Sequence, residues 1–341
     1  MFQLKVCINL DRRPERWQRM QRAFAEHDIC DVRRFSAVDG NAVPLPHNWI
    51  HTPGAYGCLR SHFQVVRSAR DAGASSVLIF EDDAVFDPQF KEKFASFVDE
   101  VPADWDMLYF GALHKDQPIK VSEHVGRITK ANSTFAYAVR NTVFDEFIEL
   151  NSRAEDVLDM NSYRLQERFN CYCFMPNLVW VESEYSDVQN RLEHHWYLEK
   201  SLVIFGSHVD RLLSQTAIVI GETSPLVDYY REYFAPLAVI GENTDKEFRV
   251  VIDDDIYVEA MDIRANLLML QDYDAATGFS KIIDLNAEQT EQLRSTHITR
   301  GIDISQNPFS KNSQCHFLTR RRPNKVFQSP NHALRLATNR R

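Results

Sequence analysis

Short apolar runs alternate with helical segments through the first 80 residues, and this alternation limits the possible folds more than any other feature of the sequence. Apolar runs predict strands at residues 4–10, 32–38 and 77–80. Residues 14–24 and 55–72 carry apolar side chains at helical spacing, the first opening on Pro14 and the second closing at Gly73. The alternation predicts an α/β fold with a mostly parallel central sheet flanked by helices.

Further elements are expected beyond residue 80. Further strands are expected at residues 107–110, 134–140 and 177–182, and a helix at 143–150. The character of the sequence changes near residue 200, and a chain of 341 residues has room for two domains. We therefore predict one domain over residues 1–200 and an α/β or α+β domain of unknown role over residues 201–341.

Charge is distributed unevenly along the chain. The formal net charge of −9 argues against nucleic acid as a partner of the whole surface. Residues 304–341 nevertheless hold eight basic side chains and no acidic one, so this basic tail carries +8 and the rest −9 − 8 = −17. The tail is interpreted either as a solvated end or as a peripheral contact with anionic membrane lipid or with an acidic acceptor.

The cysteines and the apolar segments bear on the compartment. Six cysteines are spread without a paired motif, which indicates neither a disulfide framework nor a zinc site. The N-terminal residues lack the features of a signal peptide, and no run reaches the roughly 20 apolar residues of a membrane span. We expect a cytoplasmic protein, with a peripheral position at the inner face of the membrane as the alternative if the basic tail binds lipid.

Polar residues follow three of the predicted strands. They are Asn9 to Arg13, Asp39-Gly40, and the acidic run Glu81-Asp82-Asp83. In open parallel sheets ligands bind outside the carboxyl ends of the strands. The three groups are therefore expected to meet in one ligand site.

The acidic run has the residue types that hold a hard divalent cation. Mg²⁺ and Mn²⁺ prefer carboxylate and phosphate oxygens, and one or two protein carboxylates are enough. Side chains at alternate positions of a strand point the same way, so Glu81 and Asp83 are expected to share a face. The competing interpretation is a solvated acidic loop that caps the following segment.

Six segments in register resemble glycosyltransferase family 25, the group of bacterial lipooligosaccharide β-galactosyltransferases and collagen galactosyltransferases. They are INLDRRPERWQRM (8–20), FSAVDG (35–40), GAYGCLRSHFQVV (54–66), VLIFEDDAVF (77–86), DWDMLYFG (104–111) and TFAYAVR (134–140). With a closing segment around Ser186-Asp187, the resemblance spans about residues 4–190. It implies a GT-A type fold, a UDP-sugar donor, a divalent metal (usually Mn²⁺) and inversion at the anomeric carbon.

The resemblance also implies roles for individual residues. Glu81 and Asp83 stand where the family holds its metal. Arginine pairs with phosphate in a bidentate manner, and of Arg13 and Arg16 we favour Arg13 as the diphosphate ligand. The residues expected to bind the donor are Asn9, Asp11, Arg13, Asp39, Gly40, Ser61, His62 and Asp82.

An inverting transfer needs a general base that takes the proton of the acceptor hydroxyl. Asp187 and Asp159 are the two candidates, whereas Asp106 precedes a strand and is expected at the far end of the sheet. A third metal ligand is left open among Asp187, His194 and His195.

The resulting expectation is a metal-dependent inverting glycosyltransferase. It would move a hexose, galactose first, from a UDP-sugar to a hydroxyl of a cell-surface glycan or glycolipid such as lipooligosaccharide. One alternative is a galactosyltransferase acting on a protein acceptor such as collagen-like hydroxylysine. Another is a catalytically silent family member that acts as a binding module.

Overall fold

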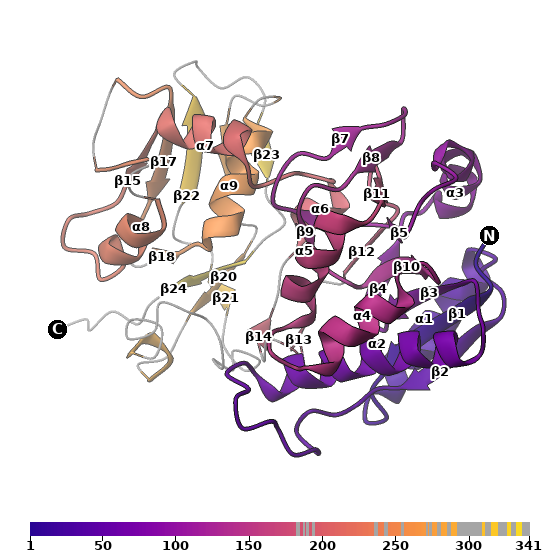
Figure 1. Ribbon diagram of the computed structural model, residues 1–341. Helices are drawn as coiled ribbons and strands as arrows, with labels where there is room; N and C mark the ends of the chain where they lie inside the picture. The colour runs from indigo at the N-terminus through magenta and orange to yellow at the C-terminus, as the bar shows by residue number, and fades with distance from the viewer. Residues whose placement is uncertain are drawn as a thin grey trace. The chain divides into compact units, whose positions relative to one another are not determined.

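The chain divides into two compact units, Met1–Ser201 and Leu202–Arg341 (Figure 1). The computed structural model describes residues 1–181, 185–186, 188, 191–192, 195–234, 238–241, 245–253, 256–270, 272, 275–277, 281–284, 288–291, 309–310, 315–319, 326–328 and 332–335. Each unit has its own sheet and apolar core and is considered separately below.

The first unit contains short strands interleaved with helices. The strands before α4 are β1 (Leu4–Asn9), β2 (Val32–Ser36), β3 (Ser76–Glu81), β4 (Ala84–Phe86), β5 (Met107–Tyr109), β6 (Leu113–His114), β7 (Ile119–Lys120), β8 (Val125–Arg127), β9 (Ala131–Asn132) and β10 (Ala136–Arg140). The later strands are β11 (Cys171–Phe174), β12 (Val179–Val181), β13 (Tyr185–Ser186) and β14 (Arg191–Leu192). The α-helices are α1 (Pro14–Glu26), α2 (Pro53–Asp71), α3 (Phe90–Phe97), α4 (Phe144–Ser152), α5 (Leu158–Arg168) and α6 (Trp196–Glu199).

Eight of these strands form the central sheet, in the order β2-β1-β3-β10-β5-β11-β8-β7. Strands β2, β1 and β3 are parallel neighbours, and β5 and β11 are parallel to each other. Strands β10 and β8 run in the opposite direction. The predicted α/β fold with a mostly parallel central sheet and flanking helices is confirmed, although an antiparallel strand separates β3 from β5.

Apolar side chains cover both faces of this sheet. On one face Ile79 of β3 belongs to a buried cluster with Leu59 of α2 and Phe147 of α4. On the other face Phe80, the next residue of β3, contacts Phe24 of α1 with 5.2 Å between the ring centroids. This alternation is what a strand buried on both faces requires. It fixes the end of β3, and therefore the acidic run, between two packed helical layers.

Helix α2 begins and ends where its sequence predicts. Thr52 caps it by accepting a hydrogen bond from the backbone N–H of Ala55 at 3.0 Å, and Pro53 occupies the first turn. Gly73 follows the helix with a φ of +66°, a conformation that favours glycine. The apolar side chains that recur at helical spacing in this segment are all buried: Leu59, Phe63, Val66 and Ala69.

Helix α1 is rotated relative to its predicted face. The apolar pattern predicts Trp17, Met20 and Phe24 on the buried side, but the structure buries Arg16 in place of Trp17. The spacing of Arg16, Met20 and Phe24 is four residues each, which is one continuous helical stripe. An arginine is buried there because it pairs with the acidic run after β3.

The second unit is also a mixture of helices and strands. Its elements are α7 (Ser207–Ser214), β15 (Thr216–Val219), α8 (Val227–Phe234), β16 (Val239–Ile240), β17 (Phe248–Ile252), β18 (Ile256–Tyr257), α9 (Ala260–Met269), β19 (Ala275–Thr277), β20 (Lys281–Asp284), β21 (Phe309–Ser310), β22 (Cys315–Thr319), β23 (Val326–Gln328) and β24 (His332–Arg335). Six strands form one sheet, in the order β16-β15-β17-β22-β19-β23, and four form another, β18-β24-β20-β21. The mixed α and β character expected of this region is confirmed.

The basic tail falls largely outside the described residues. Of its eight basic positions, the described residues include only Arg335. Its predicted membrane contact therefore stays a prediction. Among the described residues, no helix is both long and apolar enough to cross a bilayer.

Candidate functional site

A pocket opens at the carboxyl ends of β1, β2 and β3, the three parallel neighbours at one side of the sheet. It encloses about 630 Å³ of space, part of it open to solvent. The strand ends and the loops that follow them contribute Leu10, Asp39, Gly40, Glu81, Asp82 and Asp83 to its wall. The structure thus brings the three predicted polar groups to one edge of the sheet, and members of each line the same pocket.

Glu81, the last residue of β3, is held from two sides. Its Oε1 accepts a hydrogen bond from the Thr134 hydroxyl at 2.9 Å and lies 3.2 Å from Nε2 of His62. Burial raises the pKa of Glu81, but the hydrogen bond and charge of His62, followed by the Thr134 hydrogen bond, outweigh burial and lower it overall. The carboxylate is therefore ionised where it lines the pocket.

Asp82 and Asp83 form the tight turn between β3 and β4, so Asp83 does not continue the strand that ends at Glu81, and the strand alternation expected for Glu81 and Asp83 does not apply to them. Asp82 is 8% exposed and accepts hydrogen bonds from Asn9 Nδ2 at 2.6 Å and from Arg16 at 3.2 Å. Burial raises the pKa of Asp82, although these hydrogen bonds oppose it. Arg16 also lies 3.9 Å from Asp83, so one guanidinium serves both carboxylates.

The residues predicted after β1 separate into different positions. Asn9 is buried and its amide also donates to the Arg13 carbonyl at 2.9 Å, so it supports Asp82 from behind the pocket wall. Asp11 pairs with Arg34 at 2.6 Å, and its side chain is 71% exposed. Arg13 lies 3.8 Å from Glu15 and does not belong to the pocket wall.

Arg16 and Arg12 line the pocket where Arg13 was expected. Arg12 donates to Asp39 at 2.9 Å, and this hydrogen bond is the main cause that lowers the pKa of Asp39. The sequence favours Arg13 over Arg16, and the apolar pattern places Trp17 on the buried side of α1, where the structure has Arg16. The helical spacing of Arg16 with Met20 and Phe24 was the signal that could have placed it inward.

The segment after β2 is packed against α2. The Ser61 hydroxyl accepts from the backbone N–H of Val38 at 2.8 Å and donates to the Gly57 carbonyl at 2.7 Å. A Cβ on Gly40 would lie 1.7 Å from the Pro53 carbonyl oxygen, so only glycine fits. Ser61 and Gly40 therefore shape the pocket wall, and a direct contact of either with a donor stays a prediction.

The candidate bases differ in position. Asp159, in the first turn of α5, accepts a hydrogen bond from the Ser133 backbone N–H at 2.9 Å, and burial raises its pKa. It does not belong to the pocket wall, whereas Ser186 and Val188 do. Asp187 and His194 themselves lie outside the described residues. His195 contacts the Tyr197 hydroxyl at 2.8 Å and is not part of the wall.

Asp106 is at the opposite end of the sheet, as expected. Its carboxylate accepts hydrogen bonds from the Thr142 hydroxyl at 2.6 Å and from the Asn170 backbone N–H at 2.9 Å. These contacts tie β5 to the starts of α4 and β11.

Comparison with known proteins shows that part of the chain is similar to one glycosyltransferase family. Residues 2–167 match the sequence model described as glycosyltransferase family 25 (LPS biosynthesis protein). A glycosyltransferase 25 family member of Aedes aegypti is 35% identical over 123 residues, which are 30% of this chain and 20% of that protein. Procollagen galactosyltransferase 2 of Mus musculus is 30% identical over 214 residues, 51% of this chain and 34% of that protein.

A third relative matches a longer part of the chain. The procollagen lysyl hydroxylase and glycosyltransferase of Acanthamoeba polyphaga mimivirus is 24% identical over 335 residues, 84% of this chain and 35% of that protein. The chain thus spans between a fifth and about a third of the length of these three relatives.

Proposed function

We propose that the first unit, whose residues 2–167 match the sequence model of glycosyltransferase family 25, transfers a hexose, galactose first, from a UDP-sugar to a hydroxyl acceptor with inversion. One observation carries the proposal. Glu81, Asp82 and Asp83 lie together in the wall of a pocket at the carboxyl edge of β1, β2 and β3. That edge is where α/β sheets bind nucleotides.

The residues present fit a divalent metal. Glu81 and Asp83 offer carboxylate oxygens at the pocket wall, the donor type that Mn²⁺ and Mg²⁺ prefer. When bound, the cation would supply Lewis-acid neutralisation of the diphosphate as it leaves. We propose Mn²⁺ first and Mg²⁺ second.

The chain's own cations complete the donor site in this proposal. Arg12 and Arg16 line the pocket and are the guanidinium groups placed to contact a diphosphate. Asp39 is kept ionised by Arg12 and is placed to accept hydrogen bonds from a nucleoside. Asn9 acts behind them by holding Asp82 at 2.6 Å.

Asp187 is the general base that we propose, ahead of Asp159. Ser186 and Val188, on either side of it in sequence, line the pocket, whereas Asp159 does not. The Asp187→Asn variant should then lose transfer while keeping donor affinity, because the base acts on the acceptor. An equal loss in Asp159→Asn and none in Asp187→Asn would reverse the assignment.

The acceptor has two candidates. The description of the family model favours a cell-surface glycan such as lipooligosaccharide. The relatives named procollagen galactosyltransferase favour a collagen-like hydroxylysine. Purified protein offered both acceptors with UDP-galactose would show which one gains the sugar.

The donor reaction is tested without an acceptor. We expect the purified chain to hydrolyse UDP-galactose slowly in Mn²⁺, and Asp83→Asn to reduce the rate at least about 100-fold. Asp145→Asn is the matched control, since that carboxylate is 88% exposed at the start of α4. Absence of turnover together with absence of UDP-sugar binding would instead favour a silent binding module.

The basic tail is tested separately. We propose that residues 304–341 contact anionic membrane lipid, because they carry +8. Sedimentation with phosphatidylserine vesicles should then weaken as salt is raised, and removal of the tail should abolish it.

A further inference from the structure

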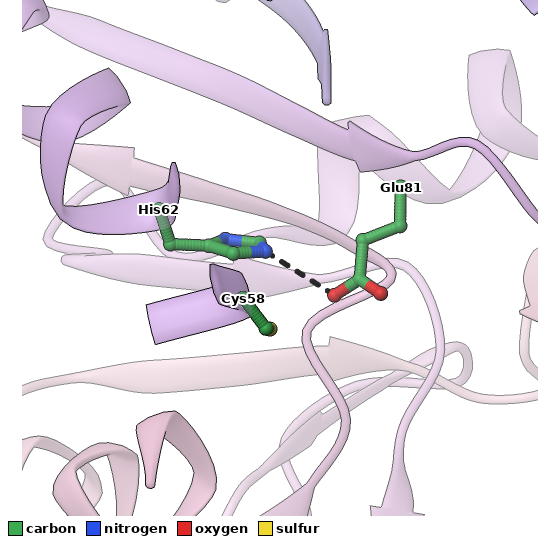
Figure 2. A group of neighbouring side chains, drawn as sticks. All are labelled: Cys58, His62 and Glu81. Atoms are coloured by element: carbon green, nitrogen blue, oxygen red, sulfur yellow. Dashed lines mark ion pairs between the residues drawn. The ribbon is translucent and has the colours of Figure 1, made fainter. Parts of the chain in front are cut away.

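Cys58, His62 and Glu81 form a group of three different metal-binding side chains in the wall of the pocket (Figure 2). Their ligand atoms all lie within 4.8 Å of one another. We propose that these three residues form a binding site for a thiophilic divalent cation, with Zn²⁺ as the best match. This site differs from the oxygen-only set proposed for the transfer reaction, with which it shares Glu81.

The backbone places the three ligands firmly. Cys58 and His62 are four residues apart on α2, which puts them on one face of the helix. Glu81 comes from the end of β3, and Figure 2 shows its carboxylate facing the His62 ring with the Cys58 side chain beside them. Sites built on helices and strands hold their ligands more accurately than sites built on loops.

The distances are close to those of a metal site. Zinc bonds of about 2.0–2.3 Å in a tetrahedral arrangement separate neighbouring ligand atoms by about 3.4–3.6 Å. Nε2 of His62 is already 3.2 Å from Oε1 of Glu81. All three ligand atoms lie within 4.8 Å of one another, so no pair exceeds the tetrahedral separation by more than about 1.4 Å.

Two neighbouring hydroxyl groups provide the outer contacts that metal ligands need. Nδ1 of His62 lies 3.0 Å from the Tyr137 hydroxyl, and Thr134 donates to Oε1 of Glu81 at 2.9 Å. If Nδ1 carries the proton and donates to Tyr137, the lone pair of Nε2 is directed at the cation. Such partners fix the tautomer and orientation of a ligating histidine.

The ligand types select the cation. A thiolate and an imidazole favour Zn²⁺ over Mn²⁺ and Mg²⁺, which prefer oxygen. Three protein ligands leave a fourth position of a tetrahedral site open toward the pocket.

The shared carboxylate gives the site a consequence. A Zn²⁺ ion on Cys58, His62 and Glu81 would withdraw Glu81 from the hard-cation set. Zinc should therefore inhibit transfer even when Mn²⁺ is in excess. This consequence rests on the proposed function, whereas the binding itself does not.

Binding is measured on the full chain after removal of metals with a chelator. Zn²⁺ is titrated in competition with a chromophoric chelator, and Co²⁺ is used as a spectroscopic probe of thiolate ligation. We expect one Zn²⁺ per chain and a thiolate-to-cobalt charge-transfer band, both lost in Cys58→Ser. Cys30→Ser is the matched control, because Cys30 is an exposed free cysteine.

A second variant keeps all three ligands. Tyr137→Phe removes only the hydroxyl group beside His62, so Zn²⁺ affinity should fall about 10-fold. Circular dichroism and thermal unfolding establish that each variant is folded. Zinc binding that is unchanged in Cys58→Ser, or a cobalt complex without the charge-transfer band, would overturn the proposal.

The inhibition is measured as a ratio within each protein. Transfer in saturating Mn²⁺ is compared with and without Zn²⁺, relative to each protein's own activity, and Cys58→Ser should lose the inhibition. Zinc binding without any transfer would support the zinc site and reject the proposed function. Transfer without zinc binding that depends on Cys58 would support the proposed function and reject the zinc site.

Discussion

At the scale of single residues, the pocket depends on side chains that never face it. Both ends of the Asn9 carboxamide are hydrogen-bonded to protein groups. Its Nδ2 donates to Asp82 and to the Arg13 carbonyl, and its Oδ1 accepts from Arg34 at 2.7 Å. A buried carboxylate held in this way keeps one orientation. Asn9 therefore determines where Asp82 points, although it belongs to the neighbouring strand.

Replacing Asn9 by leucine should test this support. The change keeps the branched shape and the number of heavy atoms of the side chain, but it leaves the buried Asp82 oxygen without the Asn9 donor, which costs about 1–3 kcal/mol in the free energy of unfolding. Urea unfolding measures the loss, and UDP binding should weaken in parallel. Asn48→Leu, at an exposed position, is the control. Equal stability of the two variants would contradict the role given to Asn9.

His114 makes a prediction about pH. It is 5% exposed, and neither ring nitrogen has a hydrogen-bond partner among the described residues. Burial lowers its pKa from 6.5 to about 4. Between these two pKa values the unfolded chain binds a proton at His114 and the folded chain does not. The contribution of His114 to the free energy of unfolding is therefore complete above pH 6.5 and is lost as the pH falls toward 4.

The expected loss attributable to His114 is about 3 kcal/mol over that range. His114→Leu removes the titrating group, so its unfolding free energy should fall less between pH 7.5 and pH 4.5 than that of the parent. His47→Leu, at an exposed histidine, should follow the parent. Parallel curves for His114→Leu and the parent would disprove the assignment.

At the scale of elements, the pocket requires α2 to approach the segment after β2 very closely. A Cβ on Gly57 would lie 2.4 Å from the Val38 carbonyl oxygen and 2.8 Å from the Gly40 nitrogen. Alanine at a helix interior normally gains about 1 kcal/mol over glycine. Here the contact is with backbone on both sides, so the clash outweighs that gain.

Gly57→Ala should therefore destabilise the protein by about 1–3 kcal/mol and weaken UDP binding, since α2 and residues 38–40 must separate. Gly73→Ala, just after the same helix, is the comparison. Its φ of +66° makes alanine cost about 1 kcal/mol, but nothing lies near its Cβ. Thermal unfolding and calorimetric binding distinguish the two, and equal UDP affinity in both variants would refute the argument.

Much of the first sheet was predictable at this scale. Runs such as Val77 to Phe80 are buried on both faces and bounded by polar residues, so their type and order follow from the sequence. Strands β6, β7 and β9 were not foreseen, because two residues carry no periodicity. The direction of β10 was also beyond prediction, because it depends on a connection and not on local pattern.

The candidate site was predictable as a location more than as a set of contacts. Polar residues at three strand ends must meet when those strands are parallel neighbours, and they do. The inward turn of Arg16 was missed because a charged residue was assigned to the solvated side of α1. Cys58 was missed because a lone cysteine at a helical position carries no signal until Glu81 arrives from another element.

At the scale of the whole molecule, the pocket belongs to one unit. The residues of its wall run from Ile8 to Val188, and all fall within Met1–Ser201. The family match, residues 2–167, also falls within that unit. Its apolar cluster includes Ile8, Leu59 and Phe147, and the described members of that cluster all belong to this unit.

A chain ending at Ser201 should consequently fold and bind UDP in Mn²⁺ with an affinity within about threefold of the full chain, because each side chain of the pocket wall is retained. Urea unfolding should give a single cooperative transition, and calorimetry should give the dissociation constant. Asp83→Asn in the shortened chain serves as the control and should weaken binding as it does in the full chain. Loss of UDP binding by a shortened chain that still unfolds cooperatively would mean that residues 202–341 contribute to the donor site, against the division that the pocket indicates.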